Sequence, residues 1–335
     1  MKIEHRFAKA LDLIEKSRRI LLTTHTRPDG DACASVVALA EALSCLNKNV
    51  ELLFLSEPPK WYDFLFEQEP PILGKDLTAD ELSEKYAQTD LIVIADTNSN
   101  SQLPGLENFL KQTDASVLVF DHHISSDSLG DVELIETSAA ATGLIIFDFL
   151  KYANWPITKS IAHSVFVAIA TDTGWFHFSN TDSRAFLAAA ELIRAGAEHL
   201  KLYRQLYQNF TTARFKLMLA ALNNLELHLE GRYACQHINR EDFRRTVAQY
   251  SDTENLIDEC RRIASVEVAA LFVEQKDGSF RCSLRSEGRV DVRKIAQKFG
   301  GGGHKMAAAT FLQGPLENAK NLIKQEIQNQ LRIPE

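Results

Sequence analysis

Short, wholly apolar runs are the feature that most constrains the fold of this chain. Residues 91–95 (LIVIA) and 117–120 (VLVF) contain no polar side chain, which is typical of strands buried on both faces of a sheet. Similar runs at residues 20–24 and 50–55 predict two more strands, and residues 132–137 predict an edge strand. Helical patterns alternate with these runs at residues 4–18, 32–46, 140–152 and 159–171. This alternation predicts a parallel sheet with helices on both sides.

The second half of the chain has a different pattern. Residues 183–230 are predicted to be helical throughout. Strands then return at residues 233–238, 266–275, 280–286 and 306–312. A turn at Lys276-Asp277-Gly278 predicts a hairpin between two of them. Two helices are predicted around the last strand, at residues 292–299 and 316–331.

These patterns predict an α/β protein with two domains. A chain of 335 residues exceeds what one ordinary core holds. We predict an N-terminal parallel-sheet domain over residues 1–190 and a smaller C-terminal α/β domain over residues 229–335. A helical connector over residues 191–228 joins them.

The composition narrows the classes of function. The formal net charge is −8, whereas proteins that grip long nucleic acids usually carry a basic surface. The acidic balance favours a small anionic substrate over a long duplex. No apolar run approaches the length of a membrane span, so no membrane partner is expected. The five cysteines are scattered and form no CxxC pair, which predicts a reducing cytoplasm.

Acidic and histidine side chains gather where the predicted strands end. The first strand is followed by HTRPDGD, the third by an aspartate and the fourth by DHH, and a later apolar segment also ends in an aspartate. The carboxyl ends of parallel strands meet at one edge of a sheet, where ligands bind. The candidates at this edge are His25, Asp29, Asp31, Asp96, Asp121, His122, His123 and Asp172.

The density of these groups predicts metal binding. Taken singly, an aspartate such as Asp96 is more often a helix cap or a turn residue. Many carboxylates together repel each other and raise each other's pKa, and divalent cations relieve that repulsion. Carboxylate and imidazole ligands suit manganese, iron, zinc or magnesium. The surplus of ligands predicts two ions about 3.5–4 Å apart, which activate a water and stabilise a phosphoryl group during attack.

At these positions the chain resembles the DHH phosphoesterases. The HTRPDGDA segment, Asp96, the Asp121-His122-His123 triplet and Asp172 follow the order of the family's four motifs. The GGGGHKMAAA segment is similar to the glycine-rich motif of the associated C-terminal domain. Together the motifs extend over nearly the whole chain, from about residue 20 to 311. The subgroup most similar to the chain is the nanoRNase and 3′-phosphoadenosine-5′-phosphate phosphatase type.

The resemblance implies a ligand set for each of two ions, with manganese expected. One ion is held by His25, Asp29 and Asp96. The other is held by Asp31, Asp96, His122 and Asp172, so Asp96 bridges the two ions.

The resemblance also implies roles for the rest of the triplet. Asp121 orients a metal ligand without contacting the metal itself. His123 faces the scissile phosphate and assists departure of the leaving group. The residues alone do not separate the roles of His122 and His123. In an extended strand the two side chains point to opposite faces, so at most one is easily a ligand.

The glycine run at residues 300–303 is the second candidate site. Glycines let the backbone approach a ligand and present N–H groups to an anion, although a glycine run alone is more often a flexible loop. Lys305 is followed directly by Met306 and not by the Ser or Thr that a Walker loop requires, so the segment is not a Walker loop. The resemblance implies that the substrate is held by Arg285, Ser286, Gly302, Gly303 and His304.

Two further positions bear on the resemblance. The family motif commonly has glycine where this chain has Ala309, which affects how closely the backbone approaches a ligand there. Arg184 resembles a family position near the active site, although an arginine at a helix start is more often solvated. Arg285 has two interpretations: a solvated charge at the end of a strand, or a guanidinium that binds a phosphate.

The function that the resemblance implies is hydrolysis of short oligoribonucleotides or linear dinucleotides to mononucleotides, together with removal of the 3′-phosphate of phosphoadenosine phosphate. Metals on one domain and an anion grip on the other are expected to measure substrate length. The alternatives are a cyclic dinucleotide phosphodiesterase, a RecJ-like single-strand exonuclease, an inorganic pyrophosphatase and a non-catalytic nucleotide-binding module. The helical stretch is also compatible with a homodimer.

Overall fold

The computed structural model of the chain describes residues 3–124, 126–208 and 210–331. It divides into two units, Met1–Asn209 and Phe210–Glu335. The elements of residues 191–228 are shared between the two units: the end of α7 (Ser183–Arg194) and α8 (His199–Tyr207) belong to the first, and α9 (Thr212–Asn223) and β6 (Glu226–His228) belong to the second.

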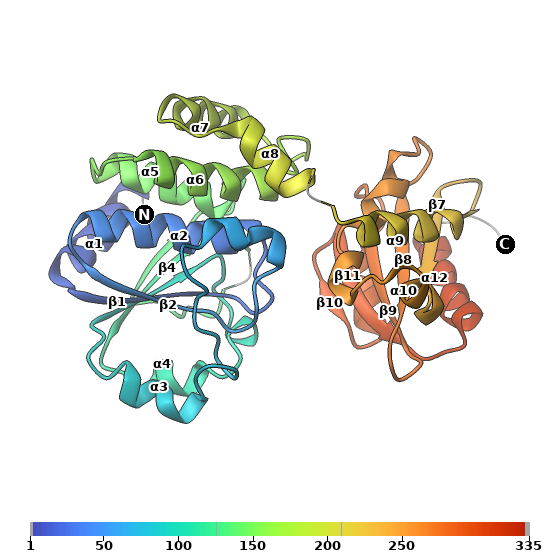
Figure 1. The fold of residues 1–335 in the computed structure, drawn as a ribbon, viewed down its shortest axis with the longest axis horizontal. Helices are drawn as coiled ribbons and strands as arrows, with labels where there is room; N and C mark the ends of the chain where they lie inside the picture. Colours follow the sequence, from blue (N-terminus) through green and yellow to red (C-terminus); the bar gives the residue numbers. More distant parts are fainter. Residues whose placement is uncertain (1–2, 125, 209, 332–335) are drawn as a thin grey trace. The chain divides into compact units, whose positions relative to one another are not determined.

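A five-stranded parallel sheet forms the centre of the first unit (Figure 1). The order β2-β1-β3-β4-β5 places β1, β3 and β4 side by side. The predicted parallel sheet is therefore confirmed. Its strands are β1 (Arg19–Thr24), β2 (Asn49–Leu53), β3 (Leu91–Ala95), β4 (Ser116–Asp121) and β5 (Val132–Ile135).

Helices cover both faces of this sheet (Figure 1). The larger core packs one face beneath α1 (Ile3–Lys16), α2 (Gly30–Cys45), α5 (Thr142–Tyr152) and α6 (Lys159–Asp172). Helices α2 and α6 are buried over most of their surface because their side chains are small and apolar nearly all round. The other face carries α3 (Ala79–Lys85) and α4 (Glu107–Gln112), seen below the sheet in Figure 1.

Several short elements were not predicted from the sequence. They are the helices α3 and α4 and the 3-10 turns η1 (Lys60–Leu65) and η2 (Asn100–Gln102). Each spans seven residues or fewer, which is too short for a helical period to stand out. Buried side chains such as Leu82 of α3 and Phe109 of α4 pack these helices against the sheet, and a capping box of Thr78 and Glu81 also starts α3, whereas η2 buries no side chain.

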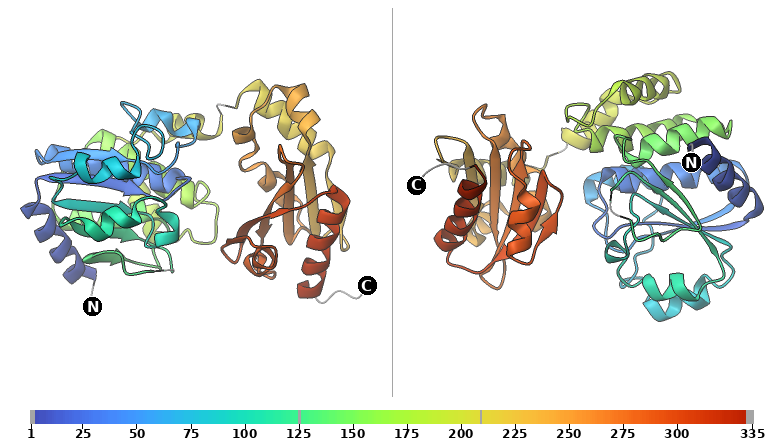
Figure 2. Two further views of the ribbon diagram at one scale, coloured as in Figure 1. Left: turned by 90° about the horizontal axis from the view of Figure 1, so that it is seen from below. Right: turned by 180° about the vertical axis from the view of Figure 1, so that it is seen from behind.

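The second unit contains a six-stranded mixed sheet in the order β10-β11-β9-β8-β7-β6 (Figure 2). Only β7 and β8 pair in parallel; the other neighbours are antiparallel. The predicted strands at 233–238 and 280–286 are confirmed. The strands are β6, β7 (Tyr233–Ile238), β8 (Val268–Glu274), β9 (Phe280–Ser286), β10 (Gly302–Gly303) and β11 (Ala307–Leu312).

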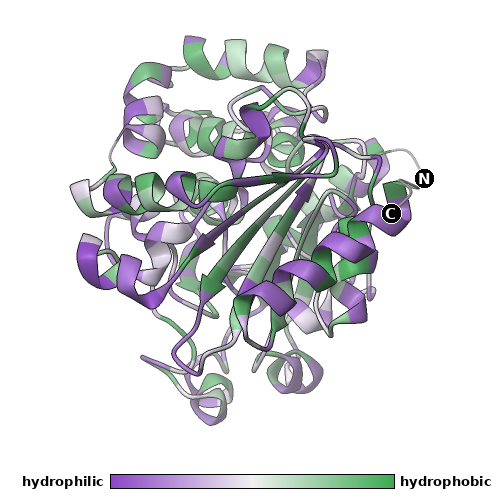
Figure 3. Cartoon of the chain, turned by 90° about the vertical axis from the view of Figure 1, so that its right-hand side faces the viewer, coloured by the Kyte–Doolittle hydropathy of each residue, from purple (hydrophilic) through white to green (hydrophobic). Residues whose placement is uncertain are grey.

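The two faces of this sheet are covered differently. Helices α11 (Val292–Lys298) and α12 (Leu316–Leu331) pack on one face. Helix α9 and the turn η4 (Leu256–Arg262) pack on the other. The remaining elements are α10 (Arg240–Thr246) and η3 (Tyr250–Thr253). Figure 3 shows the helices with alternating hydrophobic and hydrophilic segments, as expected for elements with one buried side.

The prediction that residues 183–230 contain no strand is wrong. Glu226–His228 forms the edge strand β6, which pairs with β7. Three residues are too few to show an alternating pattern, so the strand depends on its partner. Among the residues described, no helix is long and apolar enough to cross a membrane.

Candidate metal centre and active site

The carboxyl ends of three neighbouring strands carry the predicted metal ligands. His25 follows β1, Asp96 follows β3, and His122 follows Asp121, the last residue of β4. Because these strands are adjacent and parallel, their ends meet at one edge of the sheet. Helices supply the others: Asp31 lies in the first turn of α2, and Asp172 is the last residue of α6.

Asp96 lies at the centre of the cluster. Its Oδ2 is 3.5 Å from Nε2 of His25, and its Oδ1 is 3.6 Å from Nε2 of His122. The two oxygens of one buried carboxylate thus face two different imidazoles. Asp96 also has a left-handed backbone, with φ of 65°, a conformation that costs energy in most residues and is tolerated best by Asn and Asp. This geometry suits a carboxylate that bridges two ions.

Three groups of ligand atoms lie within 4.8 Å of one another. Two of them share no residue and so could hold separate ions; the third shares Asp96 with one of these and His122 with the other. The groups are His25, Asp29 and Asp96; Asp31, His122 and Asp172; and Asp96, His122 and His123. The donors are carboxylates and imidazoles, which suit a hard or borderline divalent ion.

Backbone carbonyls orient two of the histidines for metal binding. Nδ1 of His25 is 2.9 Å from the carbonyl of Thr26, and Nδ1 of His122 is 3.2 Å from that of Ala139. A carbonyl only accepts hydrogen bonds, so each Nδ1 carries the proton and each Nε2 presents its lone pair. Both Nε2 atoms face the carboxylates. This is the usual arrangement of a metal-ligating histidine.

Helix starts fix the two aspartates of the HTRPDGD segment. Asp29 is the N-cap of α2 and accepts a hydrogen bond from the Ala32 amide. Asp31 accepts hydrogen bonds from the amides of Thr142 and Gly143, at 2.6 and 2.9 Å. These two amides begin α5, so the positive end of that helix stabilises the Asp31 carboxylate.

The electrostatics of the cluster favour a bound cation. Burial raises the pKa of Asp96 well above its ordinary value, and the charges of Asp31, Asp29 and Asp172 add to the shift. Burial and the charges of Asp31 and Asp29 likewise raise the pKa of Asp172. A raised pKa of this kind means that the negative charge is poorly compensated by the protein alone. A divalent cation provides that compensation, so the residues fit a two-metal centre.

His123 is held differently from the other two histidines. Its Nδ1 is 2.7 Å from Oδ1 of the fully buried Asp121. Burial by itself lowers the pKa of His123, but the hydrogen bond and charge of Asp121 outweigh it and the net shift is upward. An imidazole that is raised in pKa and oriented in this way can carry a proton to a leaving group.

The argument that His122 and His123 point to opposite faces does not hold in the structure. Strand β4 ends at Asp121, so the alternation of an extended strand stops before the two histidines. Their rings lie edge to face with centroids 4.5 Å apart, and both approach Oδ1 of Asp96.

Thr142 is a site residue that the sequence did not reveal. Its hydroxyl donates to Oδ1 of Asp96 at 2.9 Å, and its amide donates to Asp31. It therefore positions carboxylates from both predicted ligand groups. Its one sequence signal is its place at the start of a predicted helix, where amides lack partners within the helix.

In the second unit, strand alternation separates two predicted substrate-binding residues. Arg285 is half-buried and its Nε lies 3.9 Å from Asp258. Ser286 is buried, and its hydroxyl accepts a hydrogen bond from the Gly288 amide. Adjacent residues of a strand face opposite sides. The structure therefore does not bring the Ser286 side chain to the Arg285 face.

The glycines of the 300–303 run differ in why they must be glycine. A Cβ on Gly301 would lie 2.2 Å from the carbonyl oxygen of Ala309, and one on Gly303 would lie 2.5 Å from that of Ala307. A Cβ on Gly302 would meet nothing within 4 Å. Packing against β11 thus explains Gly301 and Gly303, whereas Gly302 faces open space. His304, also exposed, closes the turn by backbone hydrogen bonds with Ala307.

Two more residues share the face of Arg285. Arg281 lies four residues before Arg285 on β9 and pairs directly with Phe311 of β11. Phe311 is 55% exposed. Gly302 pairs with Ala309, which pairs with Ser283. These small residues lie between the Arg281–Phe311 pair and the Arg285–Ala307 pair on the same face of the sheet. The alternation of residues 281, 283 and 285 in a predicted strand was the signal available for Arg281.

Two regions of this chain match models of known protein families. Residues 19–169 match the N-terminal domain of the DHH family, and residues 244–332 match the DHHA1 domain. The chain contains the two domains of the DHH architecture. The two matches include the candidate metal ligands except Asp172, together with the 300–303 glycine run and Arg285.

Relatives of the DHH chain span nearly its whole length. It is 28% identical over 313 residues to the bifunctional oligoribonuclease and PAP phosphatase NrnA of Thermus thermophilus, covering 93% of this chain and 90% of that protein. It is 27% identical over 329 residues to a probable NrnA of Streptococcus mutans, covering 97% and 99%. An exopolyphosphatase-related protein of Bacteroides fragilis shares the fold, with a TM-score of 0.89, 20% identity and coverage of 97% and 96%.

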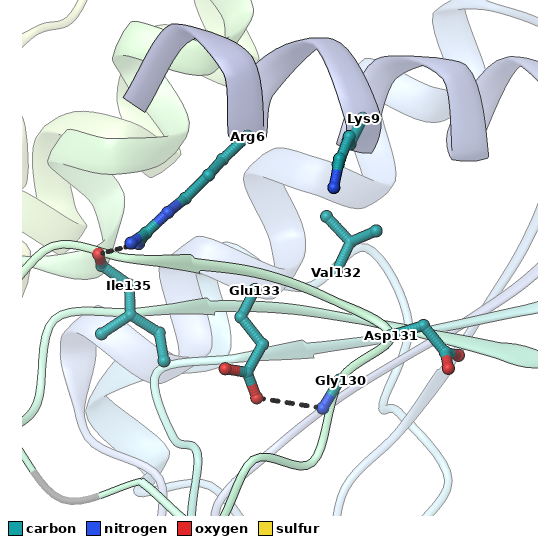
Figure 4. A pocket seen from close by; sticks show the side chains of 7 residues that line it. All are labelled: Arg6, Lys9, Gly130, Asp131, Val132, Glu133 and Ile135. Atoms are coloured by element: carbon teal, nitrogen blue, oxygen red, sulfur yellow. Dashed lines mark hydrogen bonds between the residues drawn. The ribbon is translucent and has the colours of Figure 1, made fainter. Parts of the chain in front are cut away.

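Two other features of this DHH chain lie outside the metal cluster. Arg184 forms ion pairs with Glu136 at 2.6 Å and with Asp148, so its guanidinium already has carboxylate partners. A surface pocket runs along the edge strand β5 beneath α1 (Figure 4). In it, Arg6 donates to the Ile135 carbonyl. The pocket contains none of the candidate metal ligands.

Proposed function

We propose that the protein is a two-metal phosphoesterase that hydrolyses short oligoribonucleotides or linear dinucleotides to mononucleotides and removes the 3′-phosphate of phosphoadenosine phosphate. The observation that carries the proposal is the buried Asp96 carboxylate, whose two oxygens face His25 and His122. Relatives named oligoribonuclease and PAP phosphatase align over most of the chain and supply the substrate class.

Two divalent ions, when bound, supply the positive charge that activates water and stabilises the phosphoryl oxygens. We propose the ligand set His25, Asp29 and Asp96 for one ion and Asp31, Asp96, His122 and Asp172 for the other. Manganese is the proposed ion because the donors are oxygens and imidazoles.

The chain's own residues provide the rest of the chemistry. Thr142 and the start of α5 hold Asp96 and Asp31 in place. Asp121 fixes Nδ1 of His123, which leaves Nε2 as the atom that gives a proton to the departing oxygen. Substituting either residue should therefore affect turnover more than substrate binding.

We propose that the second unit binds the part of the substrate away from the scissile bond. Arg285 is suited to a phosphate because a guanidinium donates two parallel hydrogen bonds. Gly302 leaves room for a ligand against the backbone. Phe311, paired with Arg281, offers a ring on which a base can stack. Of the predicted set, Gly303 contributes through its backbone and His304 from the exposed turn, whereas the buried Ser286 side chain holds the Gly288 amide next to Arg285.

The same observations weigh on the alternatives. A single-strand exonuclease of the RecJ kind is expected to present a long basic groove with repeated aromatic rings, and the net charge of −8 argues against it. A non-catalytic nucleotide-binding module is expected to have lost metal ligands, whereas every candidate ligand is present here. A cyclic dinucleotide has the same bases and phosphodiester bonds as a linear one but no terminal phosphate, so an activity assay must separate the two.

We also propose a homodimer formed through α7. This amphipathic helix exposes Phe186 at 55% and Leu187 at 66%, together with Ile193 at 42%. Adjacent large apolar side chains left in water are typical of protein interfaces. No disulfide joins any of the five cysteines, all of which the structure describes, and four of them are buried; this supports the proposed cytoplasmic location.

A manganese-dependent assay on a labelled RNA ladder of roughly two to twenty-four nucleotides tests the proposal, with phosphoadenosine phosphate and a cyclic dinucleotide alongside. Turnover concentrated on the shortest linear RNAs and on phosphoadenosine phosphate, and lost with chelator, is expected. Asp96→Asn should abolish it, while Asp80→Asn, at an exposed position of α3, should not. Activity on long strands alone, or on the cyclic species alone, would replace the proposal with the corresponding alternative.

A further inference from the structure

A second cluster of metal-ligating side chains lies in the other unit, on the hairpin of β6 and β7. Glu226, His228 and Cys235 each offer one ligand atom, and these atoms lie within 4.8 Å of one another. The register explains their convergence. Glu226 pairs directly with Cys235 across the two strands, and His228 lies two residues further along the same face.

The distances match a tetrahedral site. Nε2 of His228 is 3.2 Å from Oε2 of Glu226, and Sγ of Cys235 is 3.9 Å from the same oxygen. In a tetrahedral zinc site, bonds of about 2.0 Å to nitrogen or oxygen and about 2.3 Å to sulfur put neighbouring ligand atoms roughly 3.3–3.8 Å apart. The two separations from Glu226 therefore lie within a few tenths of an ångström of those in a tetrahedral zinc site.

The surroundings leave this face of Glu226 free for a cation. The buried ammonium of Lys320 contacts the other oxygen, Oε1, at 2.7 Å, and Oε1 of Glu317 at 3.0 Å. With the thiol ionised, three negative groups (Glu226, Glu317 and Cys235) face one ammonium, and a divalent ion brings the sum to zero. The side chains of Glu226 and His228 are 40% and 28% exposed, which gives an ion access from solvent.

We propose that Glu226, His228 and Cys235 bind one zinc ion, separate from the two-metal centre. The mixed thiolate, imidazole and carboxylate set selects zinc over manganese or magnesium, and water completes the fourth position. The ion displaces the thiol proton, which leaves for solvent, and binds neutral His228. Its effect is structural, because it ties the three-residue edge strand β6 to β7.

Cobalt substitution tests the proposal on the full chain. Cobalt(II) bound to a thiolate gives a near-ultraviolet charge-transfer band, and the candidate ligands of the first unit include no cysteine. Cobalt in an amount that fills the two-metal centre as well should produce this band, and zinc should abolish it. The band should persist in Asp96→Asn, so the proposal stands or fails independently of the phosphoesterase activity.

Variants distinguish this site from the other cysteines. Cys235→Ser should abolish the band and remove one equivalent of bound zinc, whereas Cys260→Ser, also buried in this unit but outside the cluster, should leave both unchanged. If the serine variant does not fold, His228→Ala at a partly exposed position provides the test. It should weaken cobalt binding at least tenfold. The absence of a thiolate band when cobalt fills every site, a band that survives in Cys235→Ser, or an unchanged cobalt affinity in His228→Ala would overturn the proposal.

Discussion

Neighbouring glycines of the DHHA1 glycine run should respond in opposite ways to the same substitution. In Gly301→Ala the new methyl lies 2.2 Å from the Ala309 carbonyl oxygen and 2.6 Å from Cβ of Thr310. Both atoms belong to the paired strand β11, which is itself held by β9. Overpacking of this kind costs about 1–3 kcal/mol. In Gly302→Ala the methyl meets no atom within 4 Å, so stability should change by less than about 0.5 kcal/mol.

Substrate binding should show the reverse order. A ligand seated against Gly302 meets the added methyl directly, and the same clash of about 1–3 kcal/mol corresponds to a rise in KM of about 5- to 150-fold. The value of kcat should fall little, because the metal centre is untouched. Gly301→Ala should lower stability at a nearly unchanged KM in the fraction that remains folded.

Urea unfolding and steady-state kinetics on a linear dinucleotide measure both effects in the same preparations. The contrast between the two variants is the control, since each adds one methyl to the same loop. A Gly302→Ala enzyme with wild-type KM would refute the use of this glycine for ligand approach. A Gly302→Ala enzyme as unstable as Gly301→Ala would show that the loop packs differently from the structure described.

Four further predictions concern the metal centre, Arg285 of the second unit and the exposed face of α7. Asp96→Asn should lower kcat by more than about 100-fold, because even the outer partners of metal ligands are worth 10- to 100-fold; near-normal turnover and metal content, by elemental analysis, would exclude a bridging role. Arg285→Ala should raise KM about 10- to 100-fold with a smaller change in kcat, as expected for the loss of charge-assisted hydrogen bonds; an unchanged KM on a dinucleotide would reject the assignment. Burial raises the pKa of Asp96 and Asp172 in the fold. The metal-free protein should therefore lose stability as pH rises from about 4, because ionising these carboxylates is less favourable in the folded chain than in the unfolded one. Manganese should raise Tm more at higher pH, and a Tm increase that does not depend on pH would contradict this. Leu187→Glu should convert a dimer to a monomer in light scattering with kcat retained, and a wild-type protein that is monomeric at high concentration would remove α7 as an interface.

Much of the fold and of the metal centre could be predicted from sequence because both depend on local patterns. Runs such as LIVIA have no polar residue to place in solvent, so they had to become buried strands. Once the strands were parallel, the residues after them had to share an edge. The same reasoning brought His25, Asp96 and Asp121 together without any knowledge of tertiary contacts.

The rest depends on contacts between distant segments. Thr142 joins the centre only because α5 begins beside Asp31 and Asp96, and neither contact is a matter of local pattern. The arrangement of His122 and His123 depends on where β4 stops, and strand ends are poorly defined by sequence. Phe311 could be proposed as a stacking platform only after the structure showed that it pairs with Arg281.

The hydrogen bonds from Thr142 and Gly143 to Asp31 also bear on when the metal centre can form. They join residues 111 and 112 positions apart, and a contact of that sequence separation forms late relative to local structure. During synthesis, the HTRPDGD segment leaves the ribosome long before the start of α5 and the Asp172 carboxylate. The acidic ligands therefore wait, solvated and able to capture ions singly, until α5 and α6 emerge and dock. A nascent chain halted before residue 142 should bind manganese weakly, and tight binding should arise only once α6 has been made.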